Sequence, residues 1–468
     1  MIINKTKTNI GSLLLLLTLA GFLFGCSKSS SNSGKTTGGG GGTTTGYQDP
    51  PQFGTPYSSV PASKDIVMYE VNMQTYTPAT FAGVQARLDS IKALGVNVIW
   101  LMPIYPVGVL KSINSPYCVK DYESVNANFG ALADLRNLVS AAHTLGMAVI
   151  LDWVANGTSW DNAWITTNPD WYVMNASGAI QQLSTYTDVA ALNFNNEDMR
   201  IAMIRAMKFW VFTANIDGFR CDFADNPPVN FWQQALDTLN TITTHKLIYL
   251  AEGTQTDEIS AGFQLDYAFD YYTQLKDVFA GSAQPSAIFN SNNVTEVLPS
   301  PGLKLRYTTN HDDASSDGST LTVYKSQQGA LSAFSIAATM GGVPLIYDSQ
   351  EVGYPKAISI FTNVPVDYTA NPNVVAAYKQ IIAYRIAHEA VKIGTLGTTF
   401  NDGIAMAYEK TYGTDDVLIM ANTKNSADTF TLPAAWQNTT WTNALTNTSI
   451  TFSTQATLPA YGYMLLQK

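Results

Sequence analysis

From about residue 65 the chain alternates between short apolar runs and amphipathic stretches. Continuous apolar runs, rich in β-branched residues, lie at 66–69, 96–101 and 147–151. Between the last two, residues 132–145 carry apolar side chains at i, i+3, i+4 and i+7, which predicts a helix with one buried face. Continuous apolar strands joined through helices indicate a parallel sheet that is covered on both faces.

The same alternation continues toward the C-terminus. Further strands are predicted to end at Asp222, at Glu252, near Phe269, at Asn310 and at Tyr347. About eight such strand–helix units predict an α/β fold of the (β/α)8 type, a TIM barrel over residues 61–395. An open, doubly wound parallel sheet is the alternative.

Two segments depart from this rhythm. Residues 153–193, after the third strand, are too long for a simple βα loop and predict a short inserted subdomain. After about residue 395 the pattern changes to short alternating strands separated by turn residues, with no helical period. We therefore expect a C-terminal all-β sandwich domain over 396–468.

The beginning of the chain predicts export. Lys5 and Lys7 precede an apolar run at 13–25 that is too short to span a bilayer comfortably, so residues 1–25 are predicted to be a signal peptide. The run ends in Gly25-Cys26, which resembles the lipobox of bacterial lipoproteins and implies that Cys26 is lipidated. The alternative is an ordinary secretory signal with an incidental cysteine. A lipid on Cys26 would anchor the protein to a membrane at the bacterial cell envelope or cell surface.

Residues 26–60 are rich in Gly, Ser and Thr and carry almost no apolar side chains, so they are expected to form a flexible tether. The whole chain has 26 Lys plus Arg against 36 Asp plus Glu, a net charge of −10, which argues against nucleic acid as a partner. Charged residues are only 13%, whereas Tyr (24) and Trp (9) are frequent, as suits an exported protein that handles an uncharged ligand. No protein partner is indicated.

Acidic residues stand at the ends of several predicted strands. Arg220 and Asp222 are two residues apart, so that their side chains lie on one face and the guanidinium keeps the carboxylate ionised. Glu252 ends a strongly apolar strand, where burial should raise its pKa as a general acid requires. The third motif is 309–313, with His311 and Asp312 at another strand end. Carboxylates that converge on the C-terminal face of a barrel indicate an active site.

With these motifs the chain resembles glycoside hydrolase family 13, the α-amylase family, from about Ile66 to the end of the chain. The resemblance is carried by 115–122, 152–156, 188–193, 218–222, Glu252, 310–312, 344–347 and 350–351. It implies that Asp222 is the nucleophile, Glu252 the general acid/base and Asp312 the transition-state stabiliser. It also implies that Tyr117, Asp152, Arg220 and His311 bind the sugar that is cleaved. A retaining glycosidase needs two carboxyls about 5–5.5 Å apart, one ionised and one protonated, which these surroundings favour.

The chain departs from the family pattern in two places. Asn156 is followed by Gly157 where the family has a histidine that contacts the sugar. Residues 223–226 lack the family's Lys-His pair, which helps to bind substrate and a structural calcium ion. By resemblance Asn156 remains a candidate calcium ligand, although the chemistry itself needs no cofactor.

The sequence therefore predicts a retaining hydrolase that cleaves α-glucosidic bonds, α-1,4 bonds foremost, in starch or malto-oligosaccharides by double displacement. Two alternatives within the family are a transglycosylase and an α-1,6-acting enzyme. A third alternative, motivated by Gly157, is a glycan-binding lipoprotein with impaired turnover.

Overall fold

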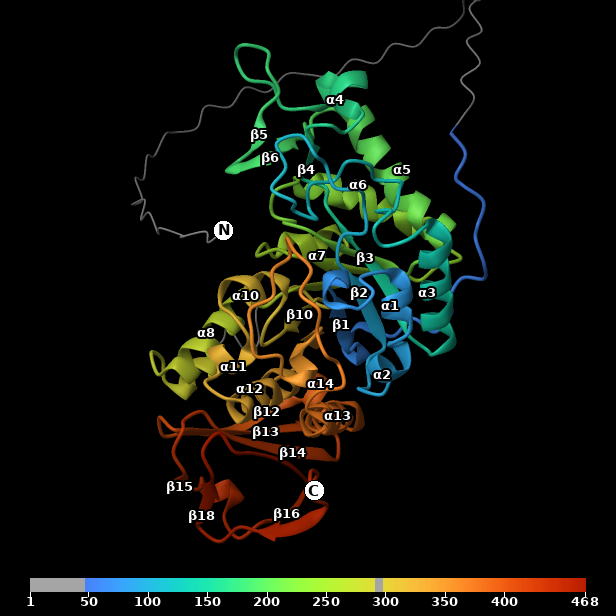
Figure 1. Ribbon diagram of the computed structural model, residues 1–468. Coiled ribbons are helices and arrows are strands. Elements are labelled where there is room, and N and C mark those ends of the chain that lie inside the picture. Colours follow the sequence, from blue (N-terminus) through green and yellow to red (C-terminus); the bar gives the residue numbers. More distant parts are fainter. Residues whose placement is uncertain (1–46, 291–297) are drawn as a thin grey trace, which may run out of the picture. The chain divides into compact units, whose positions relative to one another are not determined.

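The predicted succession of strands and helices forms a closed barrel in the computed structural model, which describes residues 47–290 and 298–468. Eight parallel strands close it in the order β1-β11-β10-β9-β8-β7-β3-β2 (Figure 1). They are β1 (Met68–Val71), β2 (Val98–Leu101), β3 (Ala148–Trp153), β7 (Gly218–Cys221), β8 (Ile248–Ala251), β9 (Leu265–Tyr267), β10 (Leu303–Arg306) and β11 (Val343–Tyr347). Closure confirms the predicted TIM barrel and excludes the open doubly wound sheet, which would leave two edge strands unpaired.

Helices connect the strands and cover the outside of the barrel (Figure 1). The α-helices are α1 (Phe81–Gln85), α2 (Leu88–Lys92), α3 (Leu132–Thr144), α5 (Glu197–Ala214), α6 (Val229–Asn240), α7 (Asp257–Ala261), α8 (Phe269–Ala280), α10 (His311–Ser316), α11 (Thr320–Val323), α12 (Gln327–Thr339), α13 (Pro372–Ala387) and α14 (Glu389–Ile393). Helix α3 confirms the predicted 132–145 helix within one residue. Its buried face consists of Leu135, Leu138, Val139 and Ala142, the positions that the periodicity selects.

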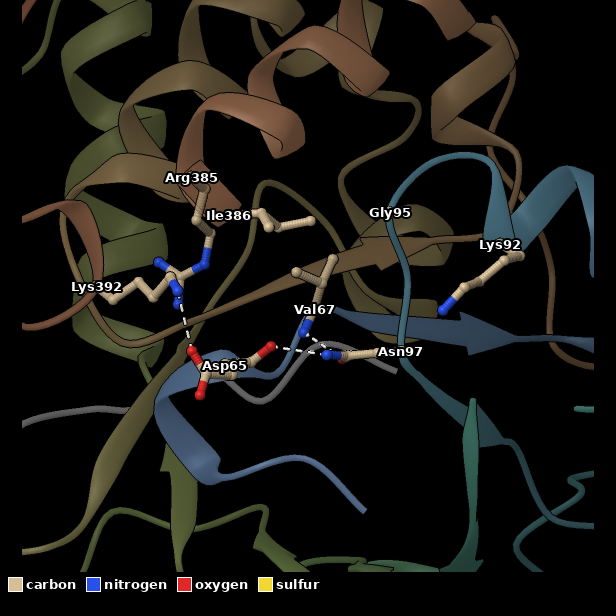
Figure 2. A pocket seen from close by; sticks show the side chains of 8 residues that line it. All are labelled: Asp65, Val67, Lys92, Gly95, Asn97, Arg385, Ile386 and Lys392. Atoms are coloured by element: carbon tan, nitrogen blue, oxygen red, sulfur yellow. Dashed lines mark hydrogen bonds and ion pairs between the residues drawn. The ribbon is translucent and has the colours of Figure 1, made fainter. Parts of the chain in front are cut away.

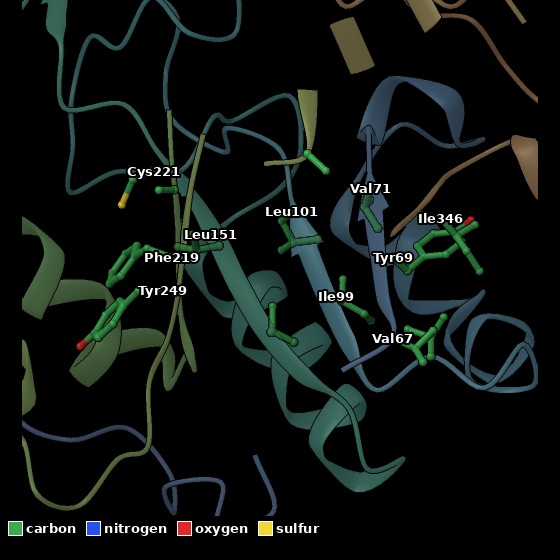
Figure 3. Close-up of a cluster of buried hydrophobic side chains, with 14 of the residues drawn as sticks. Val67, Tyr69, Val71, Ile99, Leu101, Leu151, Phe219, Cys221, Tyr249 and Ile346 are labelled. Atoms are coloured by element: carbon green, nitrogen blue, oxygen red, sulfur yellow. The ribbon is translucent and has the colours of Figure 1, made fainter. Parts of the chain in front are cut away.

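Side chains of the barrel strands alternate between two buried clusters. Met68 and Trp100 belong to a cluster inside the barrel. Their sequence neighbours Tyr69, Ile99 and Leu101 belong to the larger cluster between the strands and the helices, drawn in Figure 3. Because successive strand residues point to opposite faces, each strand supplies one apolar set to the interior and one to the helices.

A small sheet follows strand β3. Strands β4 (Gly157–Ser159), β6 (Tyr186–Ala191) and β5 (Gln182–Leu183) form it in the order β4-β6-β5, and the short helix α4 (Trp164–Thr167) lies between β4 and β5. This sheet occupies the segment 153–193 that the sequence predicts to be an inserted subdomain. It begins directly after Asn156, so it starts at the C-terminal face of the barrel.

Antiparallel strands close the chain. A six-stranded sheet has the order β12-β13-β14-β19-β16-β17, and β15 pairs with β18. The strands are β12 (Thr395–Asn401), β13 (Ala405–Tyr412), β14 (Asp415–Asn422), β15 (Asp428–Thr431), β16 (Thr440–Asn443), β17 (Thr448–Thr451), β18 (Gln455–Leu458) and β19 (Tyr463–Gln467). The Tyr384 hydroxyl of α13 donates to the carbonyl of Leu466 at 2.6 Å and links this domain to the barrel. The antiparallel arrangement confirms the predicted all-β C-terminal domain.

The predicted signal peptide 1–25, Cys26 and residues 27–46 of the predicted tether lie outside the described residues. The remainder of the tether prediction, up to residue 60, is wrong from Asp49 onward, where the chain belongs to the same compact unit as the barrel. Phe53 N donates to the Phe212 carbonyl at 2.7 Å, and Asn215 Nδ2 donates to Thr55 O at 2.8 Å. A backbone hydrogen bond to helix α5 and a side-chain hydrogen bond from Asn215, the residue that follows it, thus order a stretch whose composition alone indicates flexibility. None of the helices in the described part of the chain has the length and apolarity needed to cross a membrane.

Candidate active site

A buried arginine in strand β7 holds three carboxylates at the C-terminal face of the barrel. Nη1 of Arg220 lies 2.8 Å from Asp152 Oδ1 and 3.0 Å from Asp222 Oδ1. Nη2 of the same guanidinium lies 2.9 Å from Glu252 Oε2. The Arg220 side chain is fully buried, and a buried cation is tolerated only where anions and hydrogen bonds compensate its desolvation. The structure thus brings these four predicted residues together.

The local backbone explains why Arg220 points into the barrel. In β7, Phe219 and Cys221 pack outward against the helices, so Arg220 faces the interior. Gly218 begins the strand with a φ of 143°, and a Cβ at this position would lie 1.9 Å from the Ile248 carbonyl oxygen. Only glycine allows β7 to approach β8 this closely. That approach sets Arg220 beside the residue that follows β8, which is Glu252.

The Asp222 and Glu252 carboxyls lie side by side on one guanidinium, with 18% and 15% of their side chains exposed. Asn156 Nδ2 donates to Asp222 Oδ2 at 2.9 Å, and Phe223 N donates to Glu252 Oε2 at 2.7 Å. The pair therefore stands on one wall of the barrel mouth, held from both sides and open to solvent. A retaining glycosidase uses two neighbouring carboxyls, one as nucleophile and one as acid/base.

Burial raises the pKa values of both carboxyls. The pKa of Asp222 is raised to about 6 by desolvation, against the guanidinium of Arg220, which lowers it. The pKa of Glu252 is raised to about 7 by desolvation, again opposed by Arg220 and reinforced by the charge of Asp222. The pKa of Glu252 is the higher of the two, so Glu252 keeps its proton to higher pH than Asp222 does.

A chain of polar contacts runs from Asp152 to Glu70. His311 Nδ1 lies 2.5 Å from Glu70 Oε1, and His311 Nε2 lies 2.8 Å from the Tyr117 hydroxyl. That hydroxyl donates to Asp152 Oδ2 at 3.1 Å. Burial lowers the pKa of His311, but the carboxylates of Asp312 and Glu70 outweigh it and raise the pKa to about 10. The imidazole is therefore a cation that donates from both nitrogens.

Asp312 differs from the other carboxylates in its surroundings. Its side chain is 61% exposed, and Oδ1 lies 3.6 Å from His311 Nε2. Both residues begin helix α10 rather than ending a strand as predicted, because β10 already stops at Arg306. Asn310 caps this helix by accepting from Asp313 N at 2.9 Å. The third carboxylate thus reaches the mouth from a capped helix end.

Sequence reasoning missed four residues that surround this site. Glu70 lies within strand β1 and is buried. It is an acid in an otherwise apolar strand, and the same signal identified Asp152 in the sequence. The Trp100 indole donates to Asp152 Oδ2 at 3.1 Å. Tyr186 of β6 is 39% exposed. Burial raises the pKa of its hydroxyl, and the carboxylates of Asp222, Asp312 and Glu252 raise it further. The fourth residue is Phe223.

Calcium binding at Asn156 stays a prediction. The Asn156 amide nitrogen donates to the backbone and side chain of Asp222, at 3.0 Å and 2.9 Å. Its Oδ1 is buried without a hydrogen-bond partner, so this oxygen is free to serve as one of the six to eight oxygen ligands that calcium takes. The described residues contain no group of three or more His, Cys, Asp or Glu that could hold a metal ion. The amide nitrogen of Asn156 orients Asp222.

The absence of a side chain at Gly157 has a steric reason. It is the first residue of β4 and pairs with Ala191 of β6. A Cβ at residue 157 would lie 2.4 Å from the Ala190 carbonyl oxygen, so no larger side chain fits without moving strand β6. The histidine of the family pattern is therefore excluded by the path of this chain's inserted sheet.

A separate hollow of about 460 Å³ lies at the N-terminal end of the barrel strands, beside α13 and α14 (Figure 2). Its charged groups are satisfied within the protein. Lys392 Nζ lies 3.0 Å from Asp65 Oδ1, and Arg385 donates to the carbonyls of Ala338 and Lys64 at 3.3 Å and 3.2 Å. In barrels of this kind the N-terminal face serves stability, and the C-terminal face carries the chemistry.

Comparisons with known proteins agree with this architecture. Residues 54–174 match the family described as Alpha amylase, catalytic domain, and residues 401–465 match the family described as Maltogenic Amylase, C-terminal domain. The protein named Alpha-amylase 2 of Dictyoglomus thermophilum is 24% identical over 411 residues, which are 81% of this chain and 70% of that protein. Alpha-amylase MalA of Haloarcula japonica is 26% identical over 314 residues, 64% of this chain, which spans 46% of that longer protein.

The fold also has a counterpart among solved structures. The crystal structure of a noncanonic maltogenic alpha-amylase, AmyB, from Thermotoga neapolitana has a TM-score of 0.78 and 24% sequence identity. The match covers 86% of this chain and 98% of that one. At this identity the likeness shows the fold alone.

Proposed function

We propose that this chain, which carries an α-amylase catalytic domain and a maltogenic-amylase C-terminal domain, is a retaining hydrolase of α-glucans. Its substrates are starch and malto-oligosaccharides, and the bonds cleaved are α-1,4. The observation that carries the proposal is the placement of Asp222 and Glu252 on the two nitrogens of the Arg220 guanidinium. The amylases to which the chain is similar support the substrate class.

In the first step Glu252 gives its proton to the glycosidic oxygen while Asp222 attacks the anomeric carbon. The bond to the leaving sugar breaks, and a covalent glycosyl–Asp222 ester forms. Arg220 supports this step because its charge favours the ionised form of Asp222, which burial alone would protonate at neutral pH. Asn156 orients the carboxylate by donating to Oδ2.

In the second step Glu252, now ionised, takes a proton from a water molecule. The resulting hydroxide attacks the anomeric carbon from the side that the leaving sugar vacated, and Asp222 departs as a carboxylate. Two inversions give net retention of the α configuration. Glu252 and the attacking water supply the protons, and the residues of the chain supply the charges, so we propose that the chemistry needs no cofactor.

The sugar that is cleaved binds against the chain of polar contacts around His311. The exposed carboxylate of Asp312 and the imidazolium of His311 are suited to bind hydroxyl groups, and Tyr117 offers a ring face to the pyranose. As positive charge develops on the sugar, Asp312 and the ionised Asp222 stabilise it. An uncharged polymer fits this mouth, since its carboxylates would repel an acidic substrate.

The experiment that tests the proposal follows wild-type protein on soluble starch and maltoheptaose, with Asp222→Asn as the matched inactive control. We expect reducing ends to be released, and the first-formed product to be the α-anomer by ¹H NMR. A β-anomer would contradict the double displacement. If wild type and variant are equally inactive, the hydrolase is contradicted. The alternative that Gly157 suggests, a glycan-binding protein without turnover, would then remain.

The two carboxyl pKa values predict a narrow bell-shaped pH dependence of kcat/KM. Asp222 must be ionised, so activity is lost as the pH falls through its pKa of about 6. Glu252 must be protonated, so activity is lost as the pH rises through its pKa of about 7. Initial rates on maltoheptaose should therefore be highest between about pH 6 and 7. An optimum above about pH 8 would show that Glu252 is not the acid.

We further propose that the protein is a lipoprotein, exported and held at the bacterial cell envelope by a lipid on Cys26. The proposal rests on the apolar run at 13–25 and on the small residue before Cys26. In Triton X-114 partitioning of the full chain expressed in a bacterium, wild type should enter the detergent phase and Cys26→Ala the aqueous phase. Identical partitioning of the two proteins would contradict the anchor.

A further inference from the structure

Phe223 directly follows Asp222 and combines two uncommon properties. Its backbone has a φ of 42°, in the left-handed region that disfavours residues with a Cβ. Its ring is also exposed, at 38% of the side-chain surface, although phenylalanine is normally buried. Strained backbone concentrates at functional sites, where surrounding contacts hold it in place.

The contacts around Phe223 explain the backbone but not the ring. Phe223 N donates to Glu252 Oε2 at 2.7 Å, and Ala224 N donates to Glu252 O at 2.8 Å. Asn226 N closes the turn on the Phe223 carbonyl at 3.0 Å. Glycine would supply the same amide in the same conformation without strain. An aromatic ring at this position therefore has to be accounted for by something other than the turn.

The position of Glu252 indicates which sugar the ring faces. Arg220 and the Phe223 amide both contact Oε2, so Oε1 is the oxygen that serves the glycosidic bond. Tyr117 and His311, which are proposed to bind the cleaved sugar, contact each other and Asp152, whereas the hydrogen bonds of this turn run to Glu252. The glycosidic oxygen at Glu252 joins that sugar to the leaving one. Phe223, which touches Glu252, therefore stands beside the leaving sugar.

We propose that the exposed ring of Phe223 is a stacking platform for the sugar on the leaving-group side of the cleaved bond. The inference rests on the hydrolase function proposed above. The apolar face of a pyranose packs on an aromatic ring without needing charge. Because the platform is neutral, it favours a sugar as the leaving group. In the reverse reaction it would favour a sugar as the acceptor that attacks the glycosyl–Asp222 ester.

The test compares two substrates that share the cleaved unit but differ in leaving group. Maltoheptaose places a sugar on Phe223, whereas α-maltosyl fluoride releases fluoride and places none. For Phe223→Gly we expect kcat/KM to fall about tenfold more on maltoheptaose than on the fluoride. The thermal midpoint should not fall, because glycine relaxes the positive φ. Phe223→Leu, which keeps apolar volume but lacks a flat face, should show the same split, and Phe223→Tyr should not.

The outcomes separate this proposal from the function on which it rests. Equal losses of Phe223→Gly on both substrates, or no loss on either, would overturn the platform while leaving the hydrolase intact. A wild type that cleaves neither substrate would overturn both. Tyr412→Ala, which removes a ring 51% exposed in strand β13 of the C-terminal domain, is the matched control and should leave the ratio at its wild-type value.

Discussion

Asp222→Asn is expected to lower kcat on malto-oligosaccharides by about 10⁴- to 10⁶-fold, the loss typical when the nucleophile of a catalytic unit is removed. The amide keeps the size of the side chain but cannot form the glycosyl ester. The thermal midpoint should stay close to that of wild type, because burial disfavours the Asp222 carboxylate in the folded protein. Arg220 also keeps Asp152 and Glu252 as partners.

Reducing-end assays and thermal unfolding measure the two effects. Asp237→Asn, an exposed acid of helix α6, is the control and should behave as wild type in both. Retention of more than about 1% of kcat by Asp222→Asn would rule out the nucleophile assignment.

Chemical rescue tests the Asp222 assignment by a gain of activity, whereas Asp222→Asn tests it by a loss. In Asp222→Gly, azide can occupy the space of the missing carboxylate and attack the anomeric carbon of α-maltosyl fluoride, expelling fluoride. A single displacement inverts the centre, so β-maltosyl azide is the expected product. An α-azide, or no rescue at any azide concentration, would contradict the assigned position of Asp222.

Arg220→Met is expected to lower the free energy of unfolding by about 3–5 kcal/mol, since it leaves buried carboxylates without their common cation. Asp152 is fully buried and loses the guanidinium at 2.8 Å. The guanidinium also lowers the pKa values of Asp222 and Glu252, so its removal should shift the acidic limb of the pH profile upward. Activity at about pH 6 should then fall further than activity at about pH 7.

Arg220→Lys tests the same site in a protein that keeps its charge. A lysine side chain has one ammonium nitrogen, whereas arginine contacts Asp222 and Glu252 through two separate nitrogens. We therefore expect kcat to fall about 10²- to 10³-fold. Activity within about threefold of wild type would mean that charge alone, and not the bridging geometry, supports the pair. Lys379→Met, an exposed cation of α13, is the control for both substitutions.

Much of the fold follows from local pattern. The 3.6-residue period of helix α3 and the apolar runs of the strands are properties of neighbouring residues, and they identify a parallel barrel without knowledge of its contacts. Because parallel strands end at one face, Asp152, Asp222 and Glu252 could be assigned to a common site from their strand-end positions alone. Composition, by contrast, misassigned residues 49–60, whose order comes from hydrogen bonds to α5 and to Asn215, which follows it.

The barrel, the C-terminal β-domain and the group of acids at one end of the strands could be predicted from the sequence, because periodicity and strand ends are properties of consecutive residues. Three contacts could be learned only from the folded chain: Glu70 holds His311 across 241 positions, Asn156 orients Asp222, and β6 leaves no room for a side chain at Gly157. These depend on contacts between segments distant in the chain, and a distance of a few ångströms between such segments leaves no periodic trace in the sequence.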